Sequence, residues 1–213
     1  MTETELTTAL TDLAAGLLLL PMIVCICRRN AADPRAKRWW IRFLVLLDGC
    51  MLIGFATHYN NARPLLYRVL WVPLFAVMFE VVTVFFLLAL FLRSDGRRPR
   101  AKEMLYLHLL SLPFFGVCVY FETVRGIQAI KIYAVYAAVV SLTGIALLFR
   151  PAFALKRRPV AWLLASLLPL LPAVYFQLDR RAHFTLFVEF NCDSISHFFI
   201  IASEILLFIA AKK

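Results

Sequence analysis

The chain has 213 residues, of which 62% are hydrophobic and 17% are charged, and its mean hydropathy is +0.80. A soluble domain of this size could not bury so much apolar surface, so the composition excludes a soluble enzyme and predicts a polytopic membrane protein. The net charge of +10 does not predict nucleic-acid binding, because the basic residues form short clusters between apolar runs, a pattern that suits lipid headgroups and control of topology.

Seven apolar segments follow one another along the chain, each close to the roughly 20 residues that cross a hydrocarbon core. We expect spanning helices near residues 8–27, 39–58, 66–92, 104–121, 127–149, 160–177 and 194–211. A tight turn at Glu122, Arg125 and Gly126 would separate the fourth from the fifth. The connections are short, so we expect an all-α bundle that forms one domain over residues 1–213. Kinks are expected at the prolines inside the segments, Pro21, Pro73, Pro113, Pro169 and Pro172.

Loop charge predicts the orientation of the bundle. Most of the 23 Lys and Arg residues fall in the loops after the first, third and fifth segments and at the C-terminus. The alternate loops contain fewer, namely Arg63, Arg68, Arg125, Lys131, Arg180 and Arg181. Positive loops favour the cytoplasmic side, so the N-terminus is expected outside and the C-terminus inside, which agrees with an odd number of spans. Interfacial anchors are expected near segment ends at Trp39, Trp40, Trp71 and Trp162.

Four ionisable side chains from three segments are predicted to share one depth near the outer surface. The first and last segments enter from outside, so Asp12, Asp193 and His197 lie near their outer ends. The second segment leaves toward the outside, which places His58 near its outer end. Asp193 and His197 are four residues apart, so they share one face of a helix. Ionisable groups at membrane depth are costly and therefore indicate a functional site.

Two histidines and two carboxylates are a plausible ligand set for zinc. We expect His58, Asp193 and His197 to be the ligands, because three protein ligands leave one open position for catalysis. Asp12 would then act as a general base or orient a histidine. Bound zinc activates a water molecule near neutral pH. Simpler interpretations stay open: a partly wet interfacial His58, a buried His197 paired with Asp193, and an Asp12 that only caps its helix.

A second set of polar side chains is predicted to line a cavity deeper in the bundle. Asp48, Glu80 and Glu204 lie midway along their segments, and Asn191 precedes the last one, which it would alternatively cap. The deep carboxyls are expected to be protonated or to pair across helices with Arg42, Tyr133 or Tyr136. They would form the floor of a polar cavity or a proton path, or they would simply link helices by hydrogen bonds. His108, near the cytoplasmic end of the fourth segment, is expected to be structural.

The pattern resembles the superfamily of alkaline ceramidases and adiponectin receptors, seven-helix membrane proteins with an intramembrane zinc site that acts on lipid amides. In that superfamily a histidine ends the second helix, a serine precedes it by four residues, and the seventh helix carries His-x-x-x-His. His58 and His197 match two of these histidines. Asp193 stands where the third would be, and Gly54 stands where the serine would be. Asp12 is similar to the acidic residue near the first helix, so the resemblance implies an altered zinc site.

The chain also resembles uncharacterised bacterial proteins with seven spans, which implies a multi-pass protein of the bacterial inner membrane. The expected function is hydrolysis of a lipid amide or ester, with the substrate entering from the outer leaflet and zinc as the cofactor. The expected partners are membrane lipids and not nucleic acid. The alternative is a non-catalytic sensor, assembly factor or conduit for protons or small solutes that uses the deep carboxylates.

Overall fold

The structure, a computed structural model, describes residues 2–30, 33–94, 101–127, 129–153, 158–178, 183–185 and 189–212. The first half of the chain forms the helices α1 (Glu3–Arg28), α2 (Pro34–Tyr59), α3 (Pro64–Arg93) and α4 (Ala101–Val119), the last of which continues into a π-helical turn, η1 (Tyr120–Val124). The second half forms α5 (Ile130–Phe153), α6 (Arg158–Ser166), α7 (Leu170–Leu178) and α8 (Cys192–Lys212). Two short antiparallel strands, β1 (His183–Thr185) and β2 (Glu189–Asn191), precede α8.

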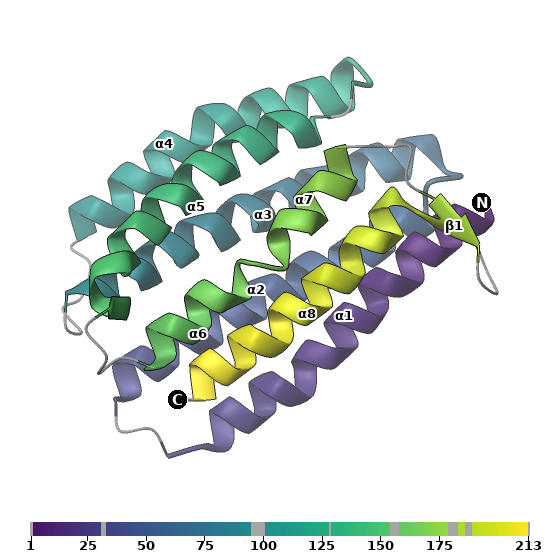
Figure 1. The fold of residues 1–213 in the computed structure, drawn as a ribbon. Helices are drawn as coiled ribbons and strands as arrows, with labels where there is room; N and C mark the ends of the chain where they lie inside the picture. Colours follow the sequence, from purple (N-terminus) through teal and green to yellow (C-terminus); the bar gives the residue numbers. More distant parts are fainter. Residues whose placement is uncertain are drawn as a thin grey trace.

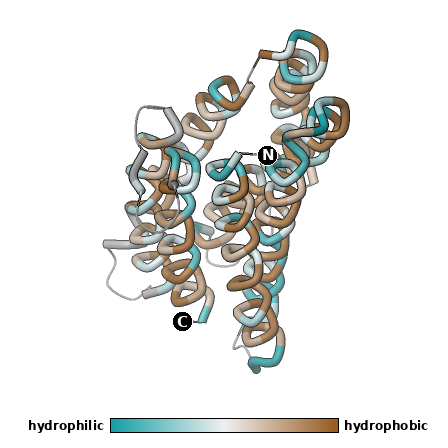
Figure 2. The backbone as a smooth tube through the Cα atoms, turned by 90° about the vertical axis from the view of Figure 1, so that its right-hand side faces the viewer, coloured by the Kyte–Doolittle hydropathy of each residue, from teal (hydrophilic) through white to brown (hydrophobic). Residues whose placement is uncertain are grey.

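Within the described residues, seven helical stretches are long and apolar enough to cross a membrane. One of them combines α6 and α7, and each of the seven overlaps a segment predicted from hydropathy. The prediction of seven potential spans in a mainly helical chain is therefore confirmed, and the paired strands β1 and β2 are an addition that the all-α prediction did not include. Figure 2 shows hydrophobic residues along most of the length of the helices and hydrophilic residues near several of their ends.

The first helix begins earlier than its apolar run. The Thr2 hydroxyl accepts a hydrogen bond from the Glu5 amide, and the Glu5 carboxylate accepts one from the Thr2 amide at 2.7 Å. This reciprocal pair is a capping box, which satisfies two of the free amides at a helix start. Asp12 consequently lies well inside α1, so the interpretation of Asp12 as a helix cap is wrong.

The turn between the fourth and fifth spans lies where the sequence predicts it. Gly126 has a φ of 62°, which glycine adopts without the steric cost that a side chain would bring. The Glu122 carboxylate accepts a hydrogen bond from the Ala129 amide at 2.8 Å, and this bond fixes the chain as it enters α5. The side chain of Glu122 is thereby assigned to the turn.

The sixth predicted span is broken, whereas the sequence predicts one kinked helix. α6 ends at Ser166 and α7 begins at Leu170, with turns at residues 167–169. Pro169 and Pro172 lack the amides that would continue the α-helical ladder through this region. Hydrogen bonds that span three residues instead of four replace them, such as the bond from the Leu168 amide to the Ala165 carbonyl at 3.2 Å. Pro21, Pro73 and Pro113 lie inside continuous helices, so a single proline did not break a span.

The packing of the helices brings the two ends of the chain together. α1 packs against both α2 and α8, while α6 and α7 cover α8 and α3 packs against α2 and α5 (Figure 1). Buried leucines join five of these helices at Leu19, Leu44, Leu88, Leu163 and Leu207. α4 packs mainly against α3 and α5, on the side of the bundle away from α1 (Figure 1). The start of α1, the end of α2 and the start of α8 consequently meet at one rim, beside the β1–β2 hairpin.

Candidate functional site

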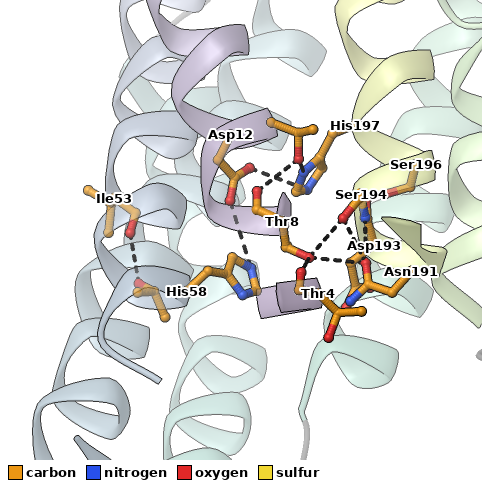
Figure 3. Close-up of polar contacts among 12 residues, drawn as sticks. Thr4, Thr8, Asp12, Ile53, His58, Asn191, Asp193, Ser194, Ser196 and His197 are labelled. Atoms are coloured by element: carbon orange, nitrogen blue, oxygen red, sulfur yellow. Dashed lines mark hydrogen bonds and ion pairs between the residues drawn. The ribbon is translucent and has the colours of Figure 1, made fainter. Parts of the chain in front are cut away.

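Asp12, His58 and His197 meet at this rim, each on a different helix. Asp12 Oδ1 lies 3.2 Å from Nε2 of His197, and Asp12 Oδ2 lies 3.8 Å from Nε2 of His58. The centroids of the two imidazole rings are 6.4 Å apart. Asp12 and His197 are buried, with side chains 5% and 7% exposed, and His58 is 24% exposed. The carboxylate therefore lies between two imidazoles, and we call these three residues the Asp12 cluster (Figure 3).

Gly54 makes room for the carboxylate of Asp12. A Cβ atom at this position would lie 3.0 Å from Asp12 Oδ2 and 3.2 Å from Asp12 Cγ. Gly54 is one helical turn before His58, so the two residues present the same face of α2 to α1. A side chain at position 54 would displace the carboxylate from its place between the rings.

Thr11 contacts the second nitrogen of the His197 ring. Its Oγ1 lies 2.8 Å from His197 Nδ1 and also donates a hydrogen bond to the Thr8 carbonyl at 2.8 Å. A hydroxyl has one hydrogen, so when it is given to Thr8 the Thr11 oxygen accepts from Nδ1–H of His197. Nε2 then presents a lone pair to Asp12 Oδ1. Two lone pairs at 3.2 Å repel, which favours a proton or a metal cation between them.

A hydroxyl and amide network fixes α1 against the start of α8. Asn191 Oδ1 accepts hydrogen bonds from the Ser194 amide at 2.9 Å, the Ser194 hydroxyl at 2.9 Å and the Thr8 hydroxyl at 3.0 Å (Figure 3). The bond to the amide of Ser194 is an N-cap, so the capping interpretation of Asn191 is confirmed. Because Thr8 is one turn before Asp12, this network also sets the position of Asp12 relative to His197.

Asp193, predicted as a ligand, is not in contact with the imidazoles. It is half-buried, and its Oδ1 lies 3.9 Å from the Cys192 sulfur. Among the described residues, it is within ion-pair distance of neither His58 nor His197. The interpretation of His197 as the partner of Asp193 is thus wrong, because α1 inserts Thr11 and Asp12 against the ring. Asp193 lies beside Asn191 at the start of α8, at the edge of the cluster (Figure 3).

The three deep carboxyls fall into two groups. Glu80 forms an ion pair with Arg42, as one interpretation predicts, and its Oε2 lies 2.9 Å from Nε2 of His108. These contacts join α2, α3 and α4 and agree with a structural role for Glu80 and His108. Asp48 Oδ1 and both carboxyl oxygens of Glu204 are buried without a hydrogen-bond partner in the described part of the chain. Glu80 is therefore paired with side chains of two other helices, whereas these oxygens of Asp48 and Glu204 are not.

The Asp12 cluster matches zinc in its donor types and comes close in its distances. In a tetrahedral site with bonds of about 2.0–2.2 Å, neighbouring ligand atoms lie roughly 3.3–3.6 Å apart. The distance of 3.2 Å between Asp12 Oδ1 and His197 Nε2 is close to this range, and the distance of 3.8 Å between Asp12 Oδ2 and His58 Nε2 is longer. No three His, Cys, Asp or Glu side chains of the described residues are already close enough to hold a metal. Binding would need an inward movement of His58, the most exposed member.

Asp12 Oδ2 provides an independent test of this fit. It is buried and accepts no hydrogen bond from the described residues. Buried carboxylate oxygens normally have a donor or a cation beside them. The only ionisable neighbour that the structure gives this oxygen within 4 Å among the described residues is His58. A proton or a cation between the carboxylate and the imidazoles would satisfy the oxygen, so the residue types present are compatible with a bound cation although their distances are not yet those of a metal site.

Sequence reasoning did not find Thr8 and Ser194, and it noted Gly54 only for its place in the motif. The available signal was the run of small polar residues at Thr7, Thr8 and Thr11, which share a face of α1. Such a stripe indicates close helix packing, but it does not show which helix is the partner.

The chain belongs to a family of unknown function, DUF6962, whose family model matches residues 7–213. All members of the Asp12 cluster lie within the matched range. No curated protein and no solved structure matches the chain. The resemblance to ceramidases and adiponectin receptors therefore stays a prediction.

Proposed function

We propose that this member of the family binds one zinc ion through Asp12, His58 and His197 and hydrolyses an amide or ester bond of a membrane lipid. The observation that carries the proposal is the buried Asp12 carboxylate, which lies between the Nε2 atoms of two imidazoles from different helices. Asp12 thus replaces Asp193 in the ligand set that the sequence predicts.

The surroundings of the cluster support a ligand role more than an ordinary ion pair. A single protonated histidine would satisfy one carboxylate, yet here two imidazoles face Asp12 and one of its oxygens still has no donor within the described structure. Histidines that bind zinc through one ring nitrogen usually form a hydrogen bond through the other. In His197 that other nitrogen, Nδ1, lies 2.8 Å from the Thr11 hydroxyl oxygen. This contact orients the ring, and when the Thr11 hydroxyl donates to the Thr8 carbonyl it favours the tautomer whose Nε2 is free.

Bound zinc would supply a Lewis acid that activates water and polarises a scissile carbonyl. The other roles belong to residues of the chain. Thr11 fixes the His197 ring, and Gly54 leaves space for the carboxylate of Asp12. Asp193, half-buried beside the cluster and in contact with neither imidazole, is the carboxylate free to accept a proton from the attacking water. Asp12 and Asp193 therefore exchange the roles that the sequence predicts for them.

The proposed setting is a membrane with the N-terminus outside, the C-terminus in the cytoplasm and the Asp12 cluster at the outer rim. Two features support it: the bias of basic residues toward alternate loops, and the apolar side chains that α4 exposes at Leu105, Tyr106, Leu109, Leu110 and Leu112. A lipid of the outer leaflet would then approach the cluster sideways. The bacterial inner membrane fits this setting.

The first test is the metal content of purified protein. We expect about one zinc per chain, lost in Asp12→Asn, His58→Ala and His197→Ala and retained in Asp193→Asn, the matched control on the same helix as His197. Zinc that is absent from the wild type, or equal in all variants, would remove the metal site from the proposal.

The second test is activity against lipids in vesicles. Incubation with N-acylated and ester-linked lipids should release fatty acid in wild type and not in His197→Ala, as measured by mass spectrometry. Asp193→Asn should bind zinc and still lose activity. A protein that binds zinc but cleaves neither lipid class would favour the alternative, a non-catalytic sensor, assembly factor or conduit. This alternative is supported by Asp48 Oδ1 and both carboxyl oxygens of Glu204, which are buried without a hydrogen-bond partner among the described residues.

A further inference from the structure

Three ionisable side chains meet on α3, at a distance from the Asp12 cluster. Glu80 of α3 forms an ion pair with Arg42 of α2, and its Oε2 lies 2.9 Å from Nε2 of His108 of α4. α2 and α4 both pack against α3, which brings these side chains together. Arg42 and His108 are 48% and 45% exposed, so both remain accessible from outside the bundle. We call these three residues the Glu80 cluster.

The hydrogen bonds of His108 determine its charge. Nδ1 lies 2.7 Å from the Met104 carbonyl, which can only accept, so Nδ1 carries a hydrogen. Nε2 faces the Glu80 carboxylate at 2.9 Å, so a second hydrogen lies between these two atoms. The Arg42 guanidinium, which stays charged, pairs with Glu80 as a carboxylate, so this second hydrogen belongs to His108. Arg42 and His108 then contribute two positive charges and Glu80 one negative charge, which gives the cluster a net charge of +1.

No second carboxylate balances this charge in the described part of the chain. Glu80 is the only Asp or Glu that the structure places there within ion-pair distance of Arg42 or His108. Arg42 also lies over the Trp39 ring, 5.9 Å from its centroid, a contact that uses none of its N–H donors. An exposed guanidinium with N–H donors to spare is well suited to bind a phosphate group.

The side chains around the cluster are arranged in the order of a phospholipid. Successive spans alternate in direction, so α2 and α4 both begin at the rim opposite the Asp12 cluster. Arg42 is eight residues from the start of α2 and His108 seven from the start of α4, or about 10–12 Å along each helix. Exposed apolar side chains follow one turn deeper on the same helix faces, at Val45 of α2 and Leu112 of α4. A headgroup at the charges would therefore have its acyl chains over these apolar residues.

We propose that Arg42 and His108 bind the phosphate group of an anionic phospholipid in the leaflet opposite the Asp12 cluster. Glu80 holds the two cations in place, and the long side chain of Arg42 reaches toward the headgroups. If the cluster served only to join helices, one cation would neutralise the single carboxylate. The inference rests on the membrane setting proposed above, but it needs neither zinc nor hydrolysis.

Native mass spectrometry of the full chain in micelles with a chelator tests this site. The probes are phosphatidylglycerol and phosphatidylcholine with the same acyl chains, since only the first has a net negative charge. We expect the wild type to bind the first phosphatidylglycerol about tenfold more tightly than phosphatidylcholine, and Arg42→Gln to lose most of this preference. Arg28→Gln is the matched control, because Arg28 is an exposed arginine in the last turn of α1, at the same rim. It should keep the preference.

His108→Gln gives a second result that does not depend on the fold of Arg42→Gln. It keeps the ion pair between Arg42 and Glu80 and removes only the charge of His108, so it should fold by circular dichroism and still lose part of the preference. Equal binding of the two lipids by the wild type would overturn the proposal. Equal losses in Arg42→Gln and Arg28→Gln would also overturn it, because they would indicate general attraction to a basic rim.

Excess glycerol phosphate separates a lipid from a free phosphate. It should leave the bound phosphatidylglycerol in place, because it cannot contact the apolar side chains beyond the charges. Displacement of the lipid by glycerol phosphate would overturn the assignment of the site to a phospholipid. Because the protein is free of metal throughout, none of these outcomes depends on whether the Asp12 cluster binds zinc.

Discussion

Replacement of Thr11 by valine isolates the hydrogen bond that orients His197. Valine has nearly the same shape as threonine but no hydroxyl, so it removes the bond to the Thr8 carbonyl and the contact with His197 Nδ1. Thr57→Val is the matched control, since Thr57 is fully buried and donates to the Ile53 carbonyl at 2.8 Å, with no hydrogen bond to an imidazole among the described residues. The difference between the two variants therefore measures the His197 contact alone.

The expected magnitude follows from the burial of the ring. Loss of a carbonyl bond costs each variant about 0.5–1.5 kcal/mol. Thr11→Val also leaves the Nδ1 atom of His197, whose side chain is 7% exposed, without its partner, which costs about 1–3 kcal/mol more. Loss of an outer-shell partner should also weaken zinc binding by about 10–100-fold.

The assay is denaturant unfolding of both variants in micelles with chelator, followed by zinc titration of the folded proteins. Thr11→Val should unfold at the lower denaturant concentration and bind zinc more weakly than Thr57→Val. If the two variants agree in unfolding free energy to within about 0.5 kcal/mol and in zinc affinity, the contact does not orient the ring, and the reasoning is wrong.

Three further predictions concern the frame around the cluster. Gly54→Ala should lower the free energy of unfolding by about 1–3 kcal/mol and weaken zinc binding, because the new Cβ would lie 3.0 Å from Asp12 Oδ2. Gly49→Ala is the control and should leave stability nearly unchanged, because the nearest atom to its Cβ would belong to Val77, at 3.9 Å. Equal changes in the two unfolding free energies would contradict the predicted clash with Asp12. Asn191→Ala should destabilise the protein by about 0.5–2 kcal/mol through loss of the α8 cap, and an unchanged unfolding midpoint would exclude that role. His108→Ala should change the unfolding free energy by less than about 1 kcal/mol and leave zinc binding unchanged, since His108 is 45% exposed and contacts Glu80. Loss of zinc binding in this variant would contradict its structural role.

The sequence was sufficient for the number of potential spans and for the common level of Asp12, His58 and His197 along the bundle. This level follows from the alternating direction of successive spans, because the start of the first span, the end of the second and the start of the last must lie on one side. The rotation of each helix about its axis does not follow from alternation. This rotation places Asp12, and not Asp193, against the imidazoles.

Other features depended on contacts between distant parts of the chain. The four-residue spacing of Asp193 and His197 suggests a pair, but the neighbour that fills the space beside His197 is α1, which the sequence does not identify. The break between α6 and α7 required two prolines, Pro169 and Pro172, to act together. Hydropathy treats such a region as continuous because all of its residues are apolar.

X-ray absorption at the zinc edge of the purified protein tests the central claim most directly. We predict a first shell of nitrogen and oxygen atoms at about 2.0–2.2 Å, with the outer scattering of two imidazoles, reduced to one imidazole in His58→Ala. A shell of sulfur at about 2.3 Å, or imidazole scattering that is unchanged in His58→Ala, would contradict a metal centre built from Asp12, His58 and His197.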